Sequence, residues 1–326
     1  MSVKFSALLA TLTAILALTL IGVASQPAPP KDDTAPMVQP TTITLLDAGR
    51  GDLEPLRWKP KVGVSVRAKM TMAMDMAMTI DGNPMPQVDL PAYVFTIVAT
   101  TKEPDASGKY PIETVYESVA LEGATDPMIR DALMQALRPL EGAKFTFKMD
   151  TRGVISEAST ANMPEQILAL IGGEQGVRNM IDSLSQPFPA EPIGIGARWK
   201  AVQTIQAHNA PAIENTLINE LIRRDGDTIE IKMTGTQNGD PQDFDLGIPG
   251  VTAKLKRASG TTEGNGFIRL DRLLPIRAEN SGNMNLVMQI TENGMTQVMD
   301  QTVKVRFTIE HLDEDGKKPI APGNAG

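Results

Sequence analysis

Hydrophobic and polar residues alternate along most of the chain with a period of two, which is typical of β-strands that bury one face. The clearest stretch is residues 69–80 (KMTMAMDMAMTI), whose even positions are Met70, Met72, Met74, Met76, Met78 and Ile80. A helix would scatter these methionines around its circumference. The pattern therefore predicts a strand that ends at the turn-forming residues 81–84 (DGNP).

Further strands are predicted on both sides of a region with helical spacing. Asp126-Pro127 is typical of a helix start, and the apolar residues from 128 to 137 follow at helical intervals. A second helical region is predicted over residues 164–184. The other strands are predicted at 92–101, 110–121, 144–149, 154–158, 199–206, 214–223, 228–236, 252–258, 266–270, 276–280, 283–292 and 296–310. The last two are joined by Asn293-Gly294, a strong tight-turn signal.

A short motif hints at internal duplication, because Arg57-Trp58-Lys59 recurs as Arg198-Trp199-Lys200. We therefore expect a mainly β (α+β) fold. It would consist of two curved antiparallel sheets, or of duplicated half-barrel halves, with a few helices inserted in the first half. The N-terminal β half with its helical insert would span residues 46–186, and the C-terminal β half would span residues 187–312.

Both ends of the chain differ from the body. Residues 1–25 are typical of a signal peptide, with Lys4, an uncharged run at 7–21 and small residues at 22–24. This run is shorter than the roughly 20 residues of a spanning helix, which favours cleavage over retention as a membrane anchor. We expect an exported protein, periplasmic or extracellular, with no integral membrane domain beyond this signal. Residues 26–45 are predicted as a proline-rich disordered linker, and 313–326 as a disordered tail.

Composition excludes several functional classes. Lys and Arg number 31 against 39 Asp and Glu, and the net charge of −8 argues against nucleic-acid partners. The chain has no cysteine and two histidines, His208 and His311, which excludes thiolate zinc sites, thiol nucleophiles and metal sites with three histidines. No Gly-x-Ser-x-Gly motif accompanies the histidines. We expect no cofactor, no metal and no catalysis, with a hydrolase, built on carboxylates or on a serine–histidine pair, as the remote alternative.

Methionine is the unusual residue, with 18 copies against 13 aromatic side chains. Met284 and Met288 repeat the alternating pattern on a late strand. Ordinary core packing accounts for such residues, because the thioether side chain fills irregular gaps. A deformable surface for a lipid or other apolar ligand is the functional alternative. Thioethers also bind Cu(I), but residues 69–80 contain no His or Cys to complete such a site.

The function that these patterns favour is binding of an apolar ligand, such as a lipid, or of an envelope component on a methionine-lined sheet. The alternative is a structural or protein-interaction module of the cell envelope whose methionines form the core, with an envelope protein as partner. The predicted ligand-binding residues are Met70, Met72, Met74, Met76, Met78, Met284 and Met288.

Four features together suggest a family resemblance. The signal peptide, the stretch 192–199 (PIGIGARW) that leads into Trp199, and Phe267-x-x-x-Asp271 accompany the methionine strand. In these features the chain resembles a group of uncharacterised exported bacterial β-proteins, whose halves resemble the periplasmic lipoprotein-carrier fold. Over roughly residues 45–310, the resemblance implies a curved sheet that holds an apolar cavity, and it brings no catalytic residues. The cysteine that anchors many such proteins to lipid is absent.

Overall fold

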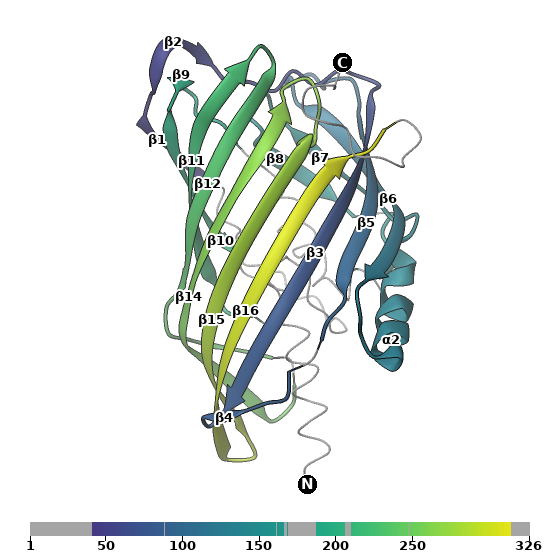
Figure 1. The fold of residues 1–326 in the computed structure, drawn as a ribbon, viewed down its shortest axis with the longest axis vertical. Helices are drawn as coiled ribbons and strands as arrows, with labels where there is room; N and C mark the ends of the chain where they lie inside the picture. Colours follow the sequence, from purple (N-terminus) through teal and green to yellow (C-terminus); the bar gives the residue numbers. More distant parts are fainter. Residues whose placement is uncertain are drawn as a thin grey trace.

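The computed structural model describes residues 41–313, except 88, 161, 166–167, 169–186, 206–209 and 247. These residues form mostly antiparallel strands, which confirms the predicted mainly β class (Figure 1). The strands make two sheets. Sheet B is a small pair, β2 (Arg50–Pro55) and β9 (Pro192–Ile195), and sheet A is the body of the protein.

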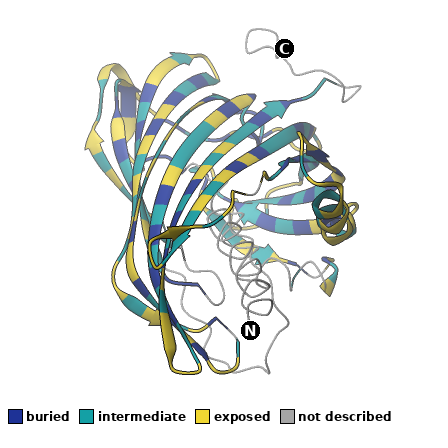
Figure 2. Cartoon of the chain, turned by 60° about the horizontal axis from the view of Figure 1, so that its bottom comes forward, coloured by how far each residue is buried: buried dark blue, intermediate teal, exposed yellow. Residues whose placement is uncertain are grey.

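Sheet A has 14 strands, and neighbouring strands along it are antiparallel. Its ends, β1 and β8, do not pair in the described part of the chain, so the sheet is open and curves around an interior (Figure 2). Two short strands lie off the main path, β4 (Asn83–Pro84) beside β3 and β13 (Gln242–Phe244) beside β14. The main path runs β1 (Thr42–Asp47), β10 (Arg198–Ile205), β11 (Ile213–Asp225), β12 (Thr228–Gly239), β14 (Val251–Arg269), β15 (Arg277–Glu292), β16 (Met295–His311), β3 (Ser65–Ile80), β5 (Ala92–Thr101), β6 (Tyr110–Glu122), β7 (Lys144–Met149) and β8 (Ile155–Ser159).

The two predicted halves both contribute to sheet A. The first half supplies β3 and the second supplies β16, and these strands pair from Ala68 opposite His311 to Ile80 opposite Met299. The start of the chain also crosses over, since β1 pairs with β10. β1 begins at Thr42, inside the range 26–45 that composition predicts as linker, because pairing with β10 orders its last residues.

Local sequence signals account for the start of the helix and for one hairpin turn. The side chain of Asp126 accepts a hydrogen bond from the backbone N–H of Met128 at 2.8 Å, and Pro127 occupies the first turn of α2 (Pro127–Leu137). This is the helix start that the sequence predicts. Asn293 and Gly294 have φ angles of 51° and 78° between β15 and β16, which confirms the predicted hairpin.

Several predicted boundaries differ from the structure. The stretch 252–258 and most of 266–270 belong to one strand, β14, and most of 276–280 and all of 283–292 belong to β15. Glycines break the sequence pattern between these stretches, but pairing on both sides keeps the backbone extended. The signal peptide, most of the linker, nearly all of the second helical region and residues 314–326 lie outside the described residues.

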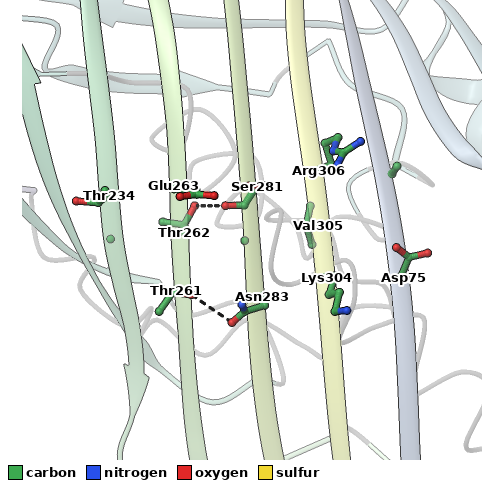
Figure 3. Close-up of a pocket in the computed structure, with 13 residues that line it drawn as sticks. Asp75, Thr234, Thr261, Thr262, Glu263, Ser281, Asn283, Lys304, Val305 and Arg306 are labelled. Atoms are coloured by element: carbon green, nitrogen blue, oxygen red, sulfur yellow. Dashed lines mark hydrogen bonds between the residues drawn. The ribbon is translucent and has the colours of Figure 1, made fainter. Parts of the chain in front are cut away.

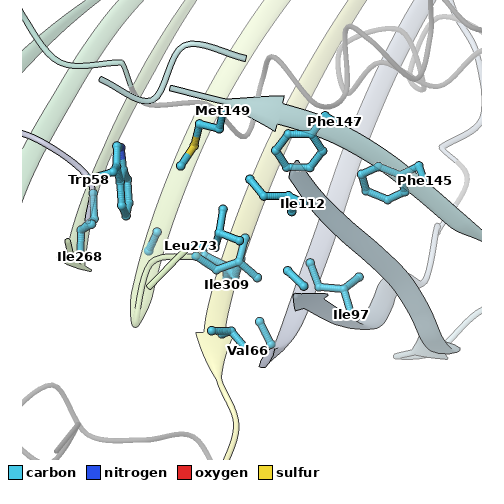
Figure 4. Close-up of a cluster of buried hydrophobic side chains, with 14 of the residues drawn as sticks. Trp58, Val66, Ile97, Ile112, Phe145, Phe147, Met149, Ile268, Leu273 and Ile309 are labelled. Atoms are coloured by element: carbon cyan, nitrogen blue, oxygen red, sulfur yellow. The ribbon is translucent and has the colours of Figure 1, made fainter. Parts of the chain in front are cut away.

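The interior of the curved sheet holds two hydrophobic clusters. The larger one combines both halves of the chain, as Figure 4 shows for Trp58, Ile112 and Phe147 beside Ile268 and Ile309. A 3-10 turn after α2, η1 (Arg138–Leu140), also contributes to it. The smaller cluster lies toward the β15–β16 turn. It consists of Leu246, Val251, Ala253, Leu255, Ala258, Met284, Leu286, Met288, Ile290 and Met299.

Candidate functional site on the inner face

The methionines of β3 lie on the inner face of sheet A. Successive side chains of a strand point to opposite faces. Met72 and Met74 are therefore buried, each with 5% of its surface exposed, while Ala73, Asp75 and Ala77 are exposed on the outer face. The alternation in residues 69–80 thus gives both the strand and its orientation.

β16 provides the neighbours of this methionine row. A row of mainly apolar side chains on β16 faces the interior beside the methionines. Gln301 interrupts this row near the smaller cluster. The pairs are Met70 with Ile309, Met72 with Phe307, Met74 with Val305, Met76 with Val303 and Met78 with Gln301.

The degree of burial changes along the methionine row. Met72 and Met74 belong to the larger cluster, whereas Met70 and Met76 are half-buried at its margin. Met78 is half-buried beside the smaller cluster. Three of these five methionines therefore keep accessible surface on the inner face.

The two predicted methionines of β15 lie on the same inner face. Met284 is opposite Val303, which is opposite Met76, so these three residues form one row across β15, β16 and β3. Met284 and Met288 have 2% and 0% of their surface exposed. The structure thus brings all seven predicted residues to one face, and it distributes them over both clusters.

Gln301 places an amide in this apolar surface. Its side chain has 0% of its surface exposed, and its Nε2 donates a hydrogen bond to Sδ of Met76 at 2.6 Å. Its Oε1 has no hydrogen-bond partner among the described residues. The sequence gives no signal for this residue beyond its place in the alternation.

A second polar group is buried at the far end of β16. His311 has 1% of its surface exposed, and burial, together with the nearby charges of Arg272 and Arg269, lowers its pKa to about 4. Arg269 also forms an ion pair with Asp271, at 2.7 Å. Burial by itself raises the pKa of Asp271, but hydrogen bonds from Arg269 and Lys61 hold this pKa below its usual value.

The outer face of sheet A carries a hollow that the alternation of hydrophobic and polar residues does not reveal. Its volume is about 670 Å³, and its lining comes from β3, β12, β14, β15 and β16 (Figure 3). Charged and hydroxyl-bearing side chains dominate the lining, among them Asp75, Glu263, Lys304 and Arg306. The sequence shows the polar residues on the outward face of each strand. Only the pairing of the strands shows which of these residues lie side by side.

Two other features are absent from the described residues. No group of three or more His, Cys, Asp or Glu side chains there is arranged to hold a metal ion. No helix in the same part of the chain combines the length and the apolar character needed to cross a membrane.

Comparison with known proteins gives one family match. Residues 156–272, from β8 to the end of β14, match DUF6263, a family of unknown function. No curated protein matches the chain.

Two of the solved structures that the chain matches are distant from it. OccK2 (OpdF) of Pseudomonas aeruginosa, in complex with glucuronate, has 8% identity and a TM-score of 0.19, over 77% of this chain and 100% of its own. The TodX monoaromatic hydrocarbon channel has 6% identity and a TM-score of 0.14, over 77% of this chain and 91% of its own. TM-scores this low do not establish a shared fold. The resemblance to the periplasmic lipoprotein-carrier fold stays an expectation.

Proposed function

We propose that this protein is an exported, non-catalytic binding protein that holds an apolar ligand, such as a lipid chain, against the inner face of sheet A. The observation that carries the proposal is the graded burial along β3. Met70, Met76 and Met78 keep accessible surface on the face where Met72 and Met74 are buried. A face that served packing alone would bury all five.

The chemistry of the exposed groups fits this role. Thioether side chains have three rotatable bonds and a polarizable sulfur, so they adjust to apolar ligands of varied shape. Sheet A is open and wide, and the two hydrophobic clusters lie at different levels of its interior. An acyl chain along the methionine row would contact both clusters. The resemblance to the lipoprotein-carrier fold belongs to this proposal, because that fold implies an apolar cavity on a curved sheet.

Export is the second part of the proposal, and it rests on the apolar run at residues 7–21 that follows Lys4. The competing function is a structural or interaction module of the cell envelope. Complete burial of Met284 and Met288 favours that alternative, since both act as core residues. The accessible methionines of β3 favour ligand binding instead.

Native mass spectrometry of protein purified gently from its own envelope fraction tests the proposal. We expect a reproducible mass adduct that disappears on denaturation and whose lipid appears in the organic extract. The adduct should be lost in the double variant Met76→Gln/Met78→Gln. It should persist in the matched surface variant Met128→Gln/Met295→Gln, whose methionines are 81% and 65% exposed. A clean protein mass that does not change when lipid is added would contradict the proposal and favour the interaction module.

A further inference from the structure

The outer-face hollow is crossed by two rows of outward side chains, on the face opposite to the methionines. Strand pairing sets both rows. Residues two apart on one strand are separated by about 6.8 Å, so the rows are close enough for one small ligand to contact both. The first row is Thr234, Glu263, Ser281, Arg306 and Ala73, and the second is Thr261, Asn283, Lys304 and Asp75.

The charged side chains of the hollow form no ion pairs with other described residues. Asp75 lies directly across from Lys304 in the pairing of β3 and β16, yet their charged atoms are not within 4.0 Å. Three outward charges elsewhere on β3 and β15 are paired. The pairs are Arg67 with Glu117 at 2.7 Å, Lys69 with Glu122 at 3.0 Å and Arg277 with Glu310 at 3.9 Å. In the hollow, Asp75, Glu263, Lys304 and Arg306 bring together charges of both signs that have no ion-pair partner among the described residues.

We propose that this hollow binds a zwitterion that carries a phosphate or carboxylate group and a primary ammonium group. Lys304 and Arg306 project from the same face of β16, where the arginine fork can bind two oxygens of an anionic group. Asp75 on β3 and Glu263 on β14 lie on either side of these cations and would attract an ammonium group. A simple anion would be repelled by the carboxylates, and a simple cation by Lys304 and Arg306.

Neutral groups of the hollow add hydrogen-bonding capacity between the charges. The hydroxyl of Thr261 donates to Oδ1 of Asn283 at 3.3 Å, which leaves the Asn283 amide nitrogen to donate to a ligand oxygen (Figure 3). The volume of about 670 Å³ lies within the range of roughly 300–1,000 Å³ typical of ligand sites. It therefore accommodates a headgroup-sized ligand.

NMR titration of the ¹⁵N-labelled protein in 150 mM salt tests this site, with O-phosphoethanolamine, inorganic phosphate and ethanolamine as separate probes. We expect saturable shifts at the amides of Ser281, Asn283 and Lys304. The Kd for O-phosphoethanolamine should be at least tenfold lower than for either half of the molecule. Equal affinity for phosphate and for O-phosphoethanolamine would overturn the proposal, as would the absence of saturation.

Single variants locate the binding. We expect the Kd for O-phosphoethanolamine to rise about tenfold in each of three variants, Arg306→Gln, Lys304→Gln and Glu263→Gln. This is the scale of one lost charged hydrogen bond. Lys232→Gln removes an exposed outward cation of β12 outside the hollow and should change nothing. If one variant fails to fold, the other two still test the site. Unchanged affinity for O-phosphoethanolamine in the folded variants would show that the ligand does not bind in the hollow.

The source of the ligand is decided separately. Co-sedimentation with phosphatidylethanolamine vesicles, compared with phosphatidylcholine vesicles whose ammonium has no N–H, distinguishes a membrane headgroup from a free zwitterion. O-phosphoethanolamine has no acyl chain, so a failure here leaves the inner-face proposal unaffected.

Discussion

The amide nitrogen of Gln301 on β16 lies 2.6 Å from Sδ of Met76 on β3 and donates a hydrogen bond to it. This contact joins the two halves of the chain inside an apolar surface. The other end of the same amide, Oε1, is buried without a partner among the described residues. A buried acceptor of this kind costs about 1–3 kcal/mol of stability.

Gln301→Met should therefore stabilise the protein, because the thioether fills a similar volume without an unpaired acceptor. We expect the free energy of unfolding in urea to rise by about 1 kcal/mol. Gln297→Met, at a half-buried position of the same strand, should change it by less than about 0.5 kcal/mol. A clear loss of stability in Gln301→Met would show that Oε1 has a partner in solution.

His311 should make the protein less stable in mild acid. Its folded pKa of about 4 lies below the ordinary value of 6.5, so the unfolded chain binds the proton more readily. The free energy of unfolding is therefore unaffected by protonation of His311 above pH 6.5, where the side chain is neutral in both states. It decreases as the pH drops toward 4, by at most about 3 kcal/mol.

Urea unfolding between pH 7.5 and 5 measures this effect above the range in which Asp271 takes up its proton. His311→Gln should flatten the pH dependence. An unchanged slope in that variant would assign the acid sensitivity to other groups.

Gly260 and Gly266 of β14 should respond differently to alanine. A Cβ at Gly260 would lie 2.6 Å from the backbone oxygen of Asn283, so part of the sheet must move. At Gly266 the nearest atom, Cβ of Ala278, is 3.7 Å away, which is ordinary contact. We expect Gly260→Ala to cost about 2 kcal/mol or more in urea unfolding and Gly266→Ala to be neutral or mildly stabilising. Equal effects would contradict the register of β14 and β15.

Phe188 links the repeated Arg-Trp-Lys segments. Its ring stacks on Trp58 at 5.5 Å between centroids and meets Trp199 edge-on at 6.4 Å. It is fully buried, so Phe188→Ala should cost about 3–5 kcal/mol. Because the chain has two tryptophans, its emission spectrum reports this contact directly. Phe244→Ala, at a half-buried position in the smaller cluster, is the control and should leave the emission unchanged.

Local patterns in the sequence were enough to predict several elements. The alternation at residues 69–80 gave β3 and the face of each methionine, Asp126-Pro127 gave the start of α2, and Asn293-Gly294 gave the hairpin of β15 and β16. Each of these signals acts through residues that are neighbours in the chain. Strand type and turn position follow from such short-range constraints.

Features that depend on tertiary pairing could not be read in the same way. β3 pairs with β16 although more than 200 residues separate them, and that pairing alone brings Asp75 next to Lys304. The burial of Gln301 and His311 also depends on which surfaces pack against the last strand. The local alternation shows which face of a strand each side chain occupies, but it does not show which strand pairs beside it.

Methyl NMR of protein labelled with ¹³C at the methionine methyl groups tests whether the methionine row of β3 binds an apolar ligand. With resonances assigned by single Met→Leu variants, a long-chain lysophospholipid is titrated into the protein. We expect saturable shifts at Met70, Met76 and Met78, with the exposed methyl groups of Met128 and Met295 unchanged. Shifts confined to the exposed methyl groups, or none at all, would contradict this expectation and leave the β3 methionines as core residues.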